Sequence, residues 1–203
     1  MVFFTITFLQ VDPEFEYQYL YRGEGMDFWN KFVKSHQILQ SIRGVSKPKF
    51  FVSAVLWKSF DAVNAYLNSE ERLEYNKKYV QFYGDLYTYD VISNHRVVNE
   101  HTQTDKFGSM IRYLVKPQYQ DKFVKEHEKF FENYDLIKAG IEQTVFLQSP
   151  SNKSQVANLT IWKSENLANS WQAPEEMQDW DSKYLEHETD RFSFDIASII
   201  TTS

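Results

Sequence analysis

The sequence predicts an α+β protein made of two tandem copies of one βαββαβ unit, whose two sheets form a β-barrel within a single chain. Three observations lead to this prediction. A Trp-Lys-Ser sequence occurs twice, starting at Trp57 and at Trp162. Each occurrence stands between segments with the two-residue period of strands and the 3.6-residue period of helices. The chain has 203 residues, which is enough for two units of about 90 residues each.

The internal repeat extends beyond the Trp-Lys-Ser sequence. A shift of 105 residues, from Trp57 to Trp162, keeps the two copies aligned without a gap for about forty residues. Nearer the N-terminus, Lys31–His36 matches Lys122–His127 at a shift of 91 residues. The shifts differ by 14 residues, so the sequence indicates that copy one has lost one strand between its first helix and the strand that carries Trp57.

Copy two shows the complete order of elements. It contains a strand over Ser109–Val115, a helix over Pro117–Ile137, a hairpin of Glu142–Gln148 and Val156–Trp162, a helical region, and a strand over Asp190–Ile200. Ser164 is the predicted N-cap of the helical region, and Pro174 suits the first turn of its second segment. The order is that of the ferredoxin-like split βαβ fold, in which both helices lie on one face of an antiparallel sheet.

Copy one repeats this order with changes. It contains a strand over Phe15–Arg22, a helix over Met26–Ile42, a strand over Lys49–Trp57, a helical region over Ser59–Tyr83 and a strand over Leu86–Val98. We expect Val2–Val11 to cover the sheet edge that the lost strand leaves bare. The predicted domains are residues 1–98 and 109–203, joined by a polar connector at residues 99–108. Stacking the bare faces of the two sheets would bury both.

Composition excludes several classes of function. The net charge of -6 provides no positive field for nucleic acid, and the absence of Cys excludes disulfides, thiolate zinc sites, Fe–S clusters and cysteine nucleophiles. No apolar run approaches the roughly 20 residues of a membrane helix. We therefore expect a soluble, cytoplasmic protein without a membrane or nucleic-acid partner. His95 and His101 lack further ligands at metal-binding spacing, so no metal site is predicted.

The segment Leu159–Trp171, with its twin Val55–Tyr66, resembles the strand-to-helix signature of the antibiotic-biosynthesis-monooxygenase family and of the related heme-degrading monooxygenases. The resemblance covers nearly the whole chain, once in each copy. Members of the family are typically dimeric α+β barrels, which implies an intramolecular version of that barrel here. It also implies oxygenation without a cofactor, in which the anion of a phenol or hydroquinone reacts directly with O₂. Such a site needs an apolar cavity, a proton acceptor and hydrogen-bond donors around the developing oxyanion.

The heme-degrading branch is less favoured. The resemblance places its pocket Trp at Trp171 and Tyr66, but it places its iron-binding His at Asp181 and Asn76. Neither copy therefore carries that iron ligand.

The candidate site residues lie mainly in copy two. The candidate catalytic residues are His127, Trp171, Tyr184 and His187. The candidate pocket residues are Trp180, Asn169, Phe123, Tyr66, His36 and Tyr79. His187 follows Tyr184 by three residues on a predicted helix face, where an imidazole could act as a base near neutral pH. Each candidate also has a purely structural interpretation. The aromatic residues could be core packing, and His187 could cap a helix. His36 and His127 could be interior residues, and Asn169 could be a surface amide.

The sequence thus favours a cofactor-independent monooxygenase that acts on an aromatic or polyketide-like small molecule within copy two. A non-catalytic module that binds a small hydrophobic ligand is the alternative from another class. An isomerase or lyase on the same fold is a third possibility. The chain would act as a pseudo-dimer, with further homo-oligomerisation left open.

Overall fold

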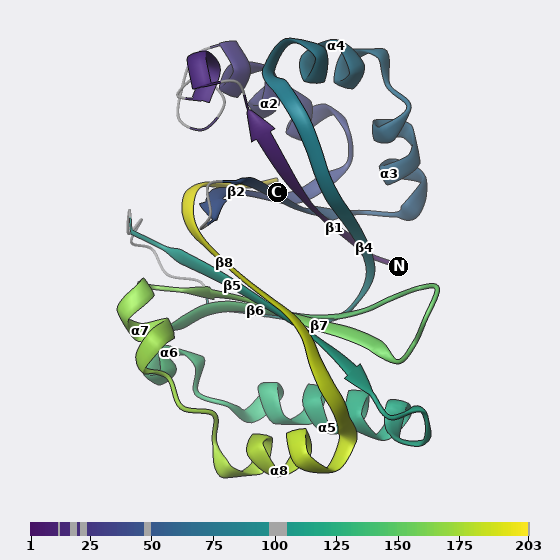
Figure 1. Cartoon of the computed structure of the whole chain (residues 1–203), viewed down its shortest axis with the longest axis vertical. Coiled ribbons are helices and arrows are strands. Elements are labelled where there is room, and N and C mark those ends of the chain that lie inside the picture. Colours follow the sequence, from purple (N-terminus) through teal and green to yellow (C-terminus); the bar gives the residue numbers. More distant parts are fainter. Residues whose placement is uncertain (12, 17–19, 21–23, 47–49, 98–104, 203) are drawn as a thin grey trace. The chain divides into compact units, whose positions relative to one another are not determined.

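The computed structural model describes residues 1–11, 13–16, 20, 24–46, 50–97 and 105–202. The chain divides into two compact units (Figure 1). Unit 1 contains Met1–Tyr89 and Phe194–Ser203, and unit 2 contains Asp90–Ser193. The unit boundaries fall inside two long strands, β4 (Val80–Arg96) and β8 (Leu185–Thr201).

Unit 1 is an antiparallel sheet with helices on one face (Figure 1). Its elements are β1 (Phe3–Val11), the 3₁₀ turn η1 (Pro13–Phe15), α2 (Glu24–Ser35), β2 (Ile38–Ser46), β3 (Phe50–Trp57), α3 (Phe60–Leu67), α4 (Glu70–Tyr79), the first part of β4 and the last part of β8. β3 pairs with β1 and β2, and β2 pairs with β8. Ser59 and Ser69 cap α3 and α4 by accepting backbone N–H groups, as N-cap residues do.

Unit 2 has the same plan. Its elements are the last part of β4, β5 (Phe107–Val115), the 3₁₀ turn η2 (Pro117–Tyr119), α5 (Gln120–Asn133), α6 (Leu136–Ala139), β6 (Ile141–Gln148), β7 (Gln155–Trp162), α7 (Glu165–Ser170), α8 (Glu175–Tyr184) and the first part of β8. β7 pairs with β5 and β6, and β6 pairs with β4. The side chain of Ser164 accepts the backbone N–H of Leu167, which confirms the predicted cap of α7.

The hydrogen-bonded strand order is β1-β3-β2-β8-β5-β7-β6-β4, and in the described part of the chain this order closes on itself. The registers of the pairings above are all antiparallel. The predicted α+β class is therefore confirmed, with a closed set of antiparallel strands.

A tryptophan at the end of a strand is hydrogen-bonded in the same way in each unit. Trp57 ends β3 and donates its indole N–H to the hydroxyl of Thr5 on β1 at 2.9 Å. Trp162 ends β7 and donates to the hydroxyl of Ser109 on β5 at 2.8 Å. Both indoles are buried, so each N–H needs such a partner.

The turn from helix to strand is also alike in the two units. Gln37 precedes β2 with φ 56°, and Gly140 precedes β6 with φ 75°. The carbonyl of Gln37 accepts the N–H of Lys58, and that of Gly140 accepts the N–H of Lys163. The left-handed backbone conformation ends each helical segment and lets the chain start the next strand.

The predicted elements of copy one need correction. The predicted strand over Phe15–Arg22 is wrong, because Phe15 lies in η1 and the described residues Glu16 and Leu20 are helical. β1 is instead the first strand of the unit. The predicted helix over Met26–Ile42 is too long, because α2 ends at Ser35 and β2 begins at Ile38.

Copy one therefore lacks no strand. β2 carries the buried polar residues Gln40, Ser41 and Arg43, which hide the apolar pattern of a strand. The two units also have nearly the same length, because Phe3 and Trp57 are 54 residues apart in the sequence and Phe107 and Trp162 are 55 apart. Most of the predicted connector, together with Pro48 and Lys49, lies outside the described residues.

The matching of His36 with His127 is also wrong. His36 follows the last residue of α2, whereas His127 lies in the middle of α5. His127 is 4% exposed and stacks on Phe146 with ring centroids 3.9 Å apart. Its Nδ1 atom has no hydrogen-bond partner among the described residues. Burial, together with the nearby His95, lowers the pKa of His127 to about 3.

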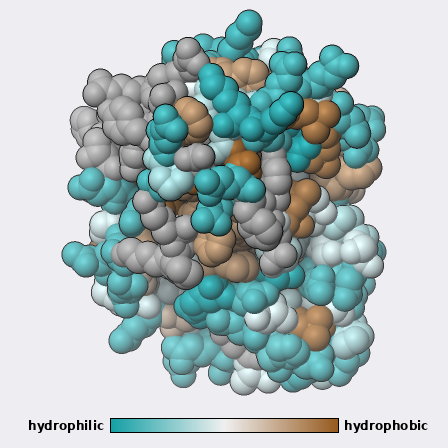
Figure 2. All heavy atoms as spheres, turned by 45° about the horizontal axis from the view of Figure 1, so that its top comes forward, coloured by the Kyte–Doolittle hydropathy of each residue, from teal (hydrophilic) through white to brown (hydrophobic). Residues whose placement is uncertain are grey.

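The described surface is largely polar. In Figure 2, hydrophobic side chains on the face shown are scattered among hydrophilic ones. None of the helices in the described ranges is long and apolar enough to span a membrane.

Removing the hydroxyl of Ser109 tests how much the hydrogen bond from the Trp162 indole contributes to stability. Ser109→Ala leaves the buried indole N–H of Trp162 unpaired, so the free energy of unfolding should fall by about 1–3 kcal/mol. Urea titration of Ser109→Ala, Trp162→Phe and the double variant measures the effect. The double variant should lose less than the sum of the single losses. Simple additivity would mean that the hydrogen bond contributes nothing.

Protonation of His127 should destabilise the fold in mild acid. Its pKa in the folded state lies below the ordinary value of 6.5, so the unfolded chain binds more protons between about pH 3 and 6.5. Its stabilising contribution is complete above pH 6.5 and falls by about 1.4 kcal/mol per pH unit below it, or about 2 kcal/mol at pH 5. Urea titrations from pH 4 to 8 should give a shallower pH dependence for His127→Phe than for the parent. Parallel curves would contradict the assignment.

Candidate functional site

A partly open cavity of about 240 Å³ lies between the helices and the sheet of unit 1. Strands β1, β3 and β4 and helices α2, α3 and α4 all contribute to its wall. The lining residues are Thr5, Thr7, Leu9, Trp29, Ser53, Val55, Trp57, Val63, Tyr66, Leu67, Arg72, Tyr75, Asn76, Gly84 and Leu86. The cavity is below the roughly 300–1,000 Å³ of sites for drug-sized ligands, so it suits a small molecule.

Aromatic rings form much of the wall. The Tyr66 ring lies 5.0 Å from that of Trp57 and 6.1 Å from that of Trp29, in tilted and edge-on arrangements that aromatic pairs favour. The indole N–H of Trp29 donates to Ser41 Oγ at 2.9 Å, so this ring is held from behind by β2. These contacts fix the shape of the apolar surface that a ligand would meet.

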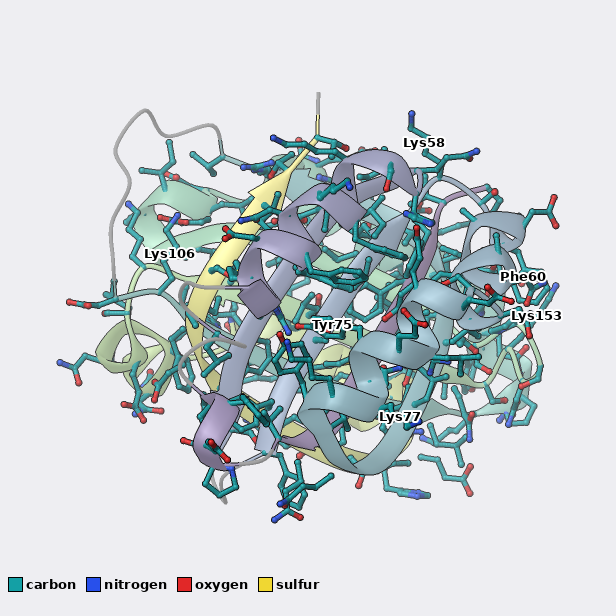
Figure 3. The ribbon with its side chains drawn as sticks, turned by 90° about the horizontal axis from the view of Figure 1, so that it is seen from above. Lys58, Phe60, Tyr75, Lys77, Lys106 and Lys153 are labelled. Atoms are coloured by element: carbon teal, nitrogen blue, oxygen red, sulfur yellow. The ribbon has the colours of Figure 1, made fainter. Side chains whose placement is uncertain are left out.

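A buried arginine lies behind the aromatic wall. Arg43 on β2 is only 1% exposed, and its Nη2 atom donates to the hydroxyl of Tyr75 at 3.3 Å. Its guanidinium carbon lies 5.2 Å from the ring centroid of Trp29. Figure 3 shows Tyr75 inside the helical layer of unit 1, whereas Lys77 on the same helix points outward. Arg43 therefore holds the hydroxyl of Tyr75 by a charge-assisted hydrogen bond.

Arg72 gives the cavity a positive charge. Its Nη1 atom donates to the carbonyl of Leu67 at 2.9 Å, and its guanidinium carbon lies 5.4 Å from the ring centroid of Tyr66. Among the described residues that line the cavity, Arg72 is the only charged one. An anionic oxygen would therefore be favoured beside it.

The sequence candidates of unit 1 have different positions. Tyr66 lines the cavity. Tyr79 packs edge-on against Phe15 at 5.5 Å and is not part of the cavity wall. His36 stacks on Phe32 at 3.6 Å, with Nε2 at 3.5 Å from a carboxylate oxygen of Glu71, and it does not line the cavity either.

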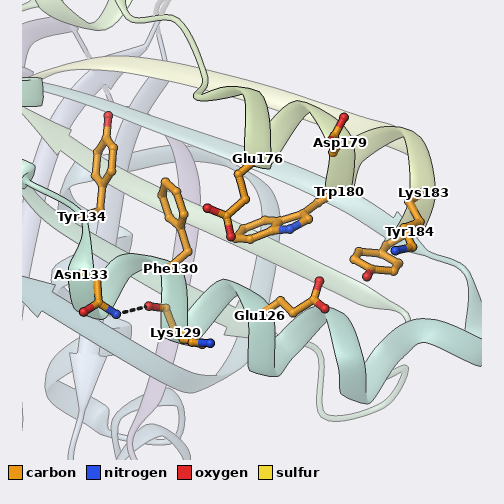
Figure 4. Close-up of a pocket in the computed structure, with 10 residues that line it drawn as sticks. All are labelled: Glu126, Lys129, Phe130, Asn133, Tyr134, Glu176, Asp179, Trp180, Lys183 and Tyr184. Atoms are coloured by element: carbon orange, nitrogen blue, oxygen red, sulfur yellow. Dashed lines mark hydrogen bonds between the residues drawn. The ribbon is translucent and has the colours of Figure 1, made fainter.

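Unit 2 carries a larger, open groove of about 590 Å³ between α5 and α8 (Figure 4). Its lining residues are Glu126, Lys129, Phe130, Asn133, Tyr134, Glu176, Asp179, Trp180, Lys183 and Tyr184. Two sequence candidates, Trp180 and Tyr184, are among them. Phe123 and His127 lie in the core instead.

The other three candidates of copy two are apart from this groove. Trp171 packs on Trp162 at 5.6 Å and donates its indole N–H to the hydroxyl of Tyr134 at 3.1 Å. Asn169 is exposed on α7. His187 is exposed on β8, and the predicted helix face that reaches it is wrong because α8 ends at Tyr184.

Sequence reasoning assigned no role to Trp29, Arg43, Arg72 or Tyr75. Arg72 and Tyr75 lie in the predicted helical region over Ser59–Tyr83, four and one residues before Asn76. Asn76 aligns with the iron-ligand position of the heme-degrading enzymes, and it lines the cavity together with Arg72 and Tyr75. That alignment is the signal that could have identified Arg72 and Tyr75. Nothing local in the sequence marks Arg43 as buried.

Neither a protein-family model nor a curated protein sequence matches the chain. Solved structures do match it along its whole length. Two are described as a "putative monooxygenase". The one from Lactobacillus acidophilus has a TM-score of 0.77 at 10% identity, covering 98% of this chain and 96% of the other. The one from Fusobacterium nucleatum has a TM-score of 0.73 at 13% identity, covering 98% and 94%.

A third match is described as an anthrone oxidase-like protein. It has a TM-score of 0.61 at 13% identity and covers 98% of this chain and 92% of the other. Identities this low carry information about the fold alone. The chain therefore has the α+β barrel fold of these monooxygenase-named structures, which confirms at the level of fold the resemblance to the antibiotic-biosynthesis-monooxygenase family.

Proposed function

We propose that this chain is a cofactor-independent monooxygenase that oxidises a small, acidic phenol or hydroquinone in the cavity of unit 1. The observation that carries the proposal is the aromatic cavity with Arg72 as its only charged residue among those described. This assignment differs from the sequence-based hypothesis, which favoured copy two.

We also infer that the chain is a fused pair of ferredoxin-like units. The paired tryptophan anchors support this inference, because Trp57 and Trp162 each bond to a hydroxyl on the first strand of their unit. The paired left-handed residues Gln37 and Gly140 support it as well.

The proposed reaction begins with the phenolate. The guanidinium of Arg72 lowers the free energy of the bound anion relative to the neutral phenol, so an acidic phenol enters or becomes ionised beside it. The electron-rich ring then reduces O₂, and the resulting peroxide loses water. For a phenol with a free para carbon, one oxygen atom of O₂ becomes the second carbonyl of a quinone, and the other leaves as water with the two hydrogens of the substrate.

The polar groups of the cavity limit the substrate class. No Asp, Glu or His is among the described residues that line it. We propose that the proton leaves through water and that the substrate is acidic enough to ionise near neutral pH with the help of Arg72. Tyr75, held by Arg43, and Asn76 provide hydrogen bonds that orient the bound anion.

The same lack of a proton acceptor favours one second candidate. A cavity whose described lining residues include no carboxylate or imidazole also suits a module that binds an aromatic anion without converting it. Oxygen consumption distinguishes the two functions, because binding alone consumes none.

Arg72→Gln tests the proposal. Oxygen uptake should be measured with hydroquinones and naphthols and corrected for autoxidation without enzyme. Loss of one charge that stabilises the developing anion should lower kcat/KM by about 100–1,000-fold. Arg191→Gln is the matched control, because Arg191 pairs with Glu188 on the exposed face of β8 in unit 2.

The outcomes separate the candidates. Uptake that depends on Arg72 and not on Arg191 supports the monooxygenase. Calorimetric binding of the phenolate without uptake supports the binding module. Uptake that is equal in Arg72→Gln and the parent would exclude this cavity as the reaction site. Thermal melting of each variant checks that the fold is intact.

A further inference from the structure

The groove of unit 2 has an aromatic floor. The rings of Phe130 and Trp180 meet edge to face with centroids 5.2 Å apart, and Phe130 stacks with Tyr134 at 4.9 Å. Trp180 is only 7% exposed, and its indole N–H forms no hydrogen bond to another described residue. The floor is thus a packed surface that can bind a flat ring from the open side.

Carboxylates stand along the same groove. Figure 4 shows Glu176 beside the ring of Trp180, with Asp179 on the same helix. In the described part of the chain, neither carboxylate forms an ion pair. Glu126 on the facing helix lies 3.8 Å from Lys122. Negative charge beside aromatic rings is the combination that binds organic cations.

Lysines also line the groove, and their positions are informative. The ammonium groups of Lys183 and Lys122 lie 5.1 and 5.7 Å from the ring centroid of Tyr184. A side-chain hydrogen bond with Tyr184 raises the pKa of Lys183, so it keeps its charge there. At the end of the groove near Tyr184, lysine side chains of the protein therefore already provide the positive charge. Lys129 lies on α5 at the other side, and among the described residues no ammonium group lies over the rings near Glu176 and Trp180.

Unit 1 shows what occupies the corresponding place. Glu71 aligns with Glu176, and Tyr66 aligns with Trp171. Phe32 contacts Tyr66, and Tyr134 contacts Trp171, so Phe32 and Tyr134 hold corresponding positions. In unit 1 the imidazole of His36 lies flat on Phe32, with an interplanar angle of 10°. Its Nε2 atom is 3.5 Å from Glu71.

Unit 2 has no such ring at this place. The residue before Gln37 is His36, whereas the residue before Gly140 is Ala139. Tyr134 and Glu176 instead line the open groove. Unit 1 thus fills the position with its own flat nitrogen base, held between an aromatic ring and a carboxylate.

We infer that the groove of unit 2 binds a flat, positively charged nitrogen heteroaromatic molecule, which stacks on Trp180 and Tyr134 and pairs with Glu176. This inference does not depend on the proposed function. The cavity of unit 1 carries the opposite charge, from Arg72, and therefore disfavours the same ligand.

A matched pair of probes tests the inference. N-methylquinolinium carries a permanent positive charge, whereas quinoline has nearly the same shape and is neutral at pH 8. Isothermal titration calorimetry of the full chain should give a Kd for N-methylquinolinium at least tenfold lower than that for quinoline.

Glu176→Gln should weaken binding of N-methylquinolinium at least tenfold and leave quinoline unchanged. Glu71→Gln is the matched control, because it removes the repeat-related carboxylate in unit 1, and it should change neither Kd. Trp180→Phe should weaken both probes. Arg72→Gln should leave the binding of N-methylquinolinium unchanged, which separates this site from the cavity of unit 1.

Three results would overturn the inference. They are equal affinity for the two probes, an equal loss in Glu176→Gln and Glu71→Gln, and no loss in Glu176→Gln. Glu176 is exposed, so its variant should melt at the temperature of the parent, and the calorimetric result then reports binding.

Discussion

The hydrogen bond from a strand-end tryptophan to a hydroxyl on the neighbouring strand fixes the local geometry in each unit. In unit 1 it joins the end of β3 to β1, directly before Ser59 starts α3. The start of α3 in turn determines where Tyr66 meets Trp57. The same sequence of contacts places Trp171 against Trp162 in unit 2. The strand register and the position of the aromatic side chains above the sheet thus depend on one buried indole per unit.

The sequence predicted the fold where local signals agree with tertiary contacts. Copy two was predicted nearly element by element, because β6 and β7 are apolar strands and Ser164 is a clear cap. Copy one was predicted less well. The similarity of Lys31–His36 to Lys122–His127 suggested a register that the packing does not follow, and Arg43 made a buried strand look like part of a helix. Its burial depends on Tyr75, 32 residues away, which no local pattern reveals.

The site was harder to predict than the fold. The family resemblance named Tyr66 as a pocket residue, and Tyr66 lines the cavity of unit 1. Repeat alignment could not tell the two pockets apart, because Trp180 and Tyr75 occupy the same repeat position. The difference arises from neighbours outside the repeat match, such as Trp29 in unit 1 and Phe130 in unit 2. With Arg72 in one pocket and Glu176 in the other, the proposed sites select ligands of opposite charge. Two units with the same order of elements can thus carry two chemically distinct surfaces.

The positions of the unit boundaries within β4 and β8 have a consequence for dissection of the protein. β2 pairs on one side with residues 194–201 of β8, which follow β2 by about 150 residues in the sequence. A nascent or truncated chain that ends at the connector would present the backbone amides and carbonyls of β2 to solvent as an open template for strand addition. A fragment that contains only the first half of the chain therefore lacks one strand of the sheet of unit 1.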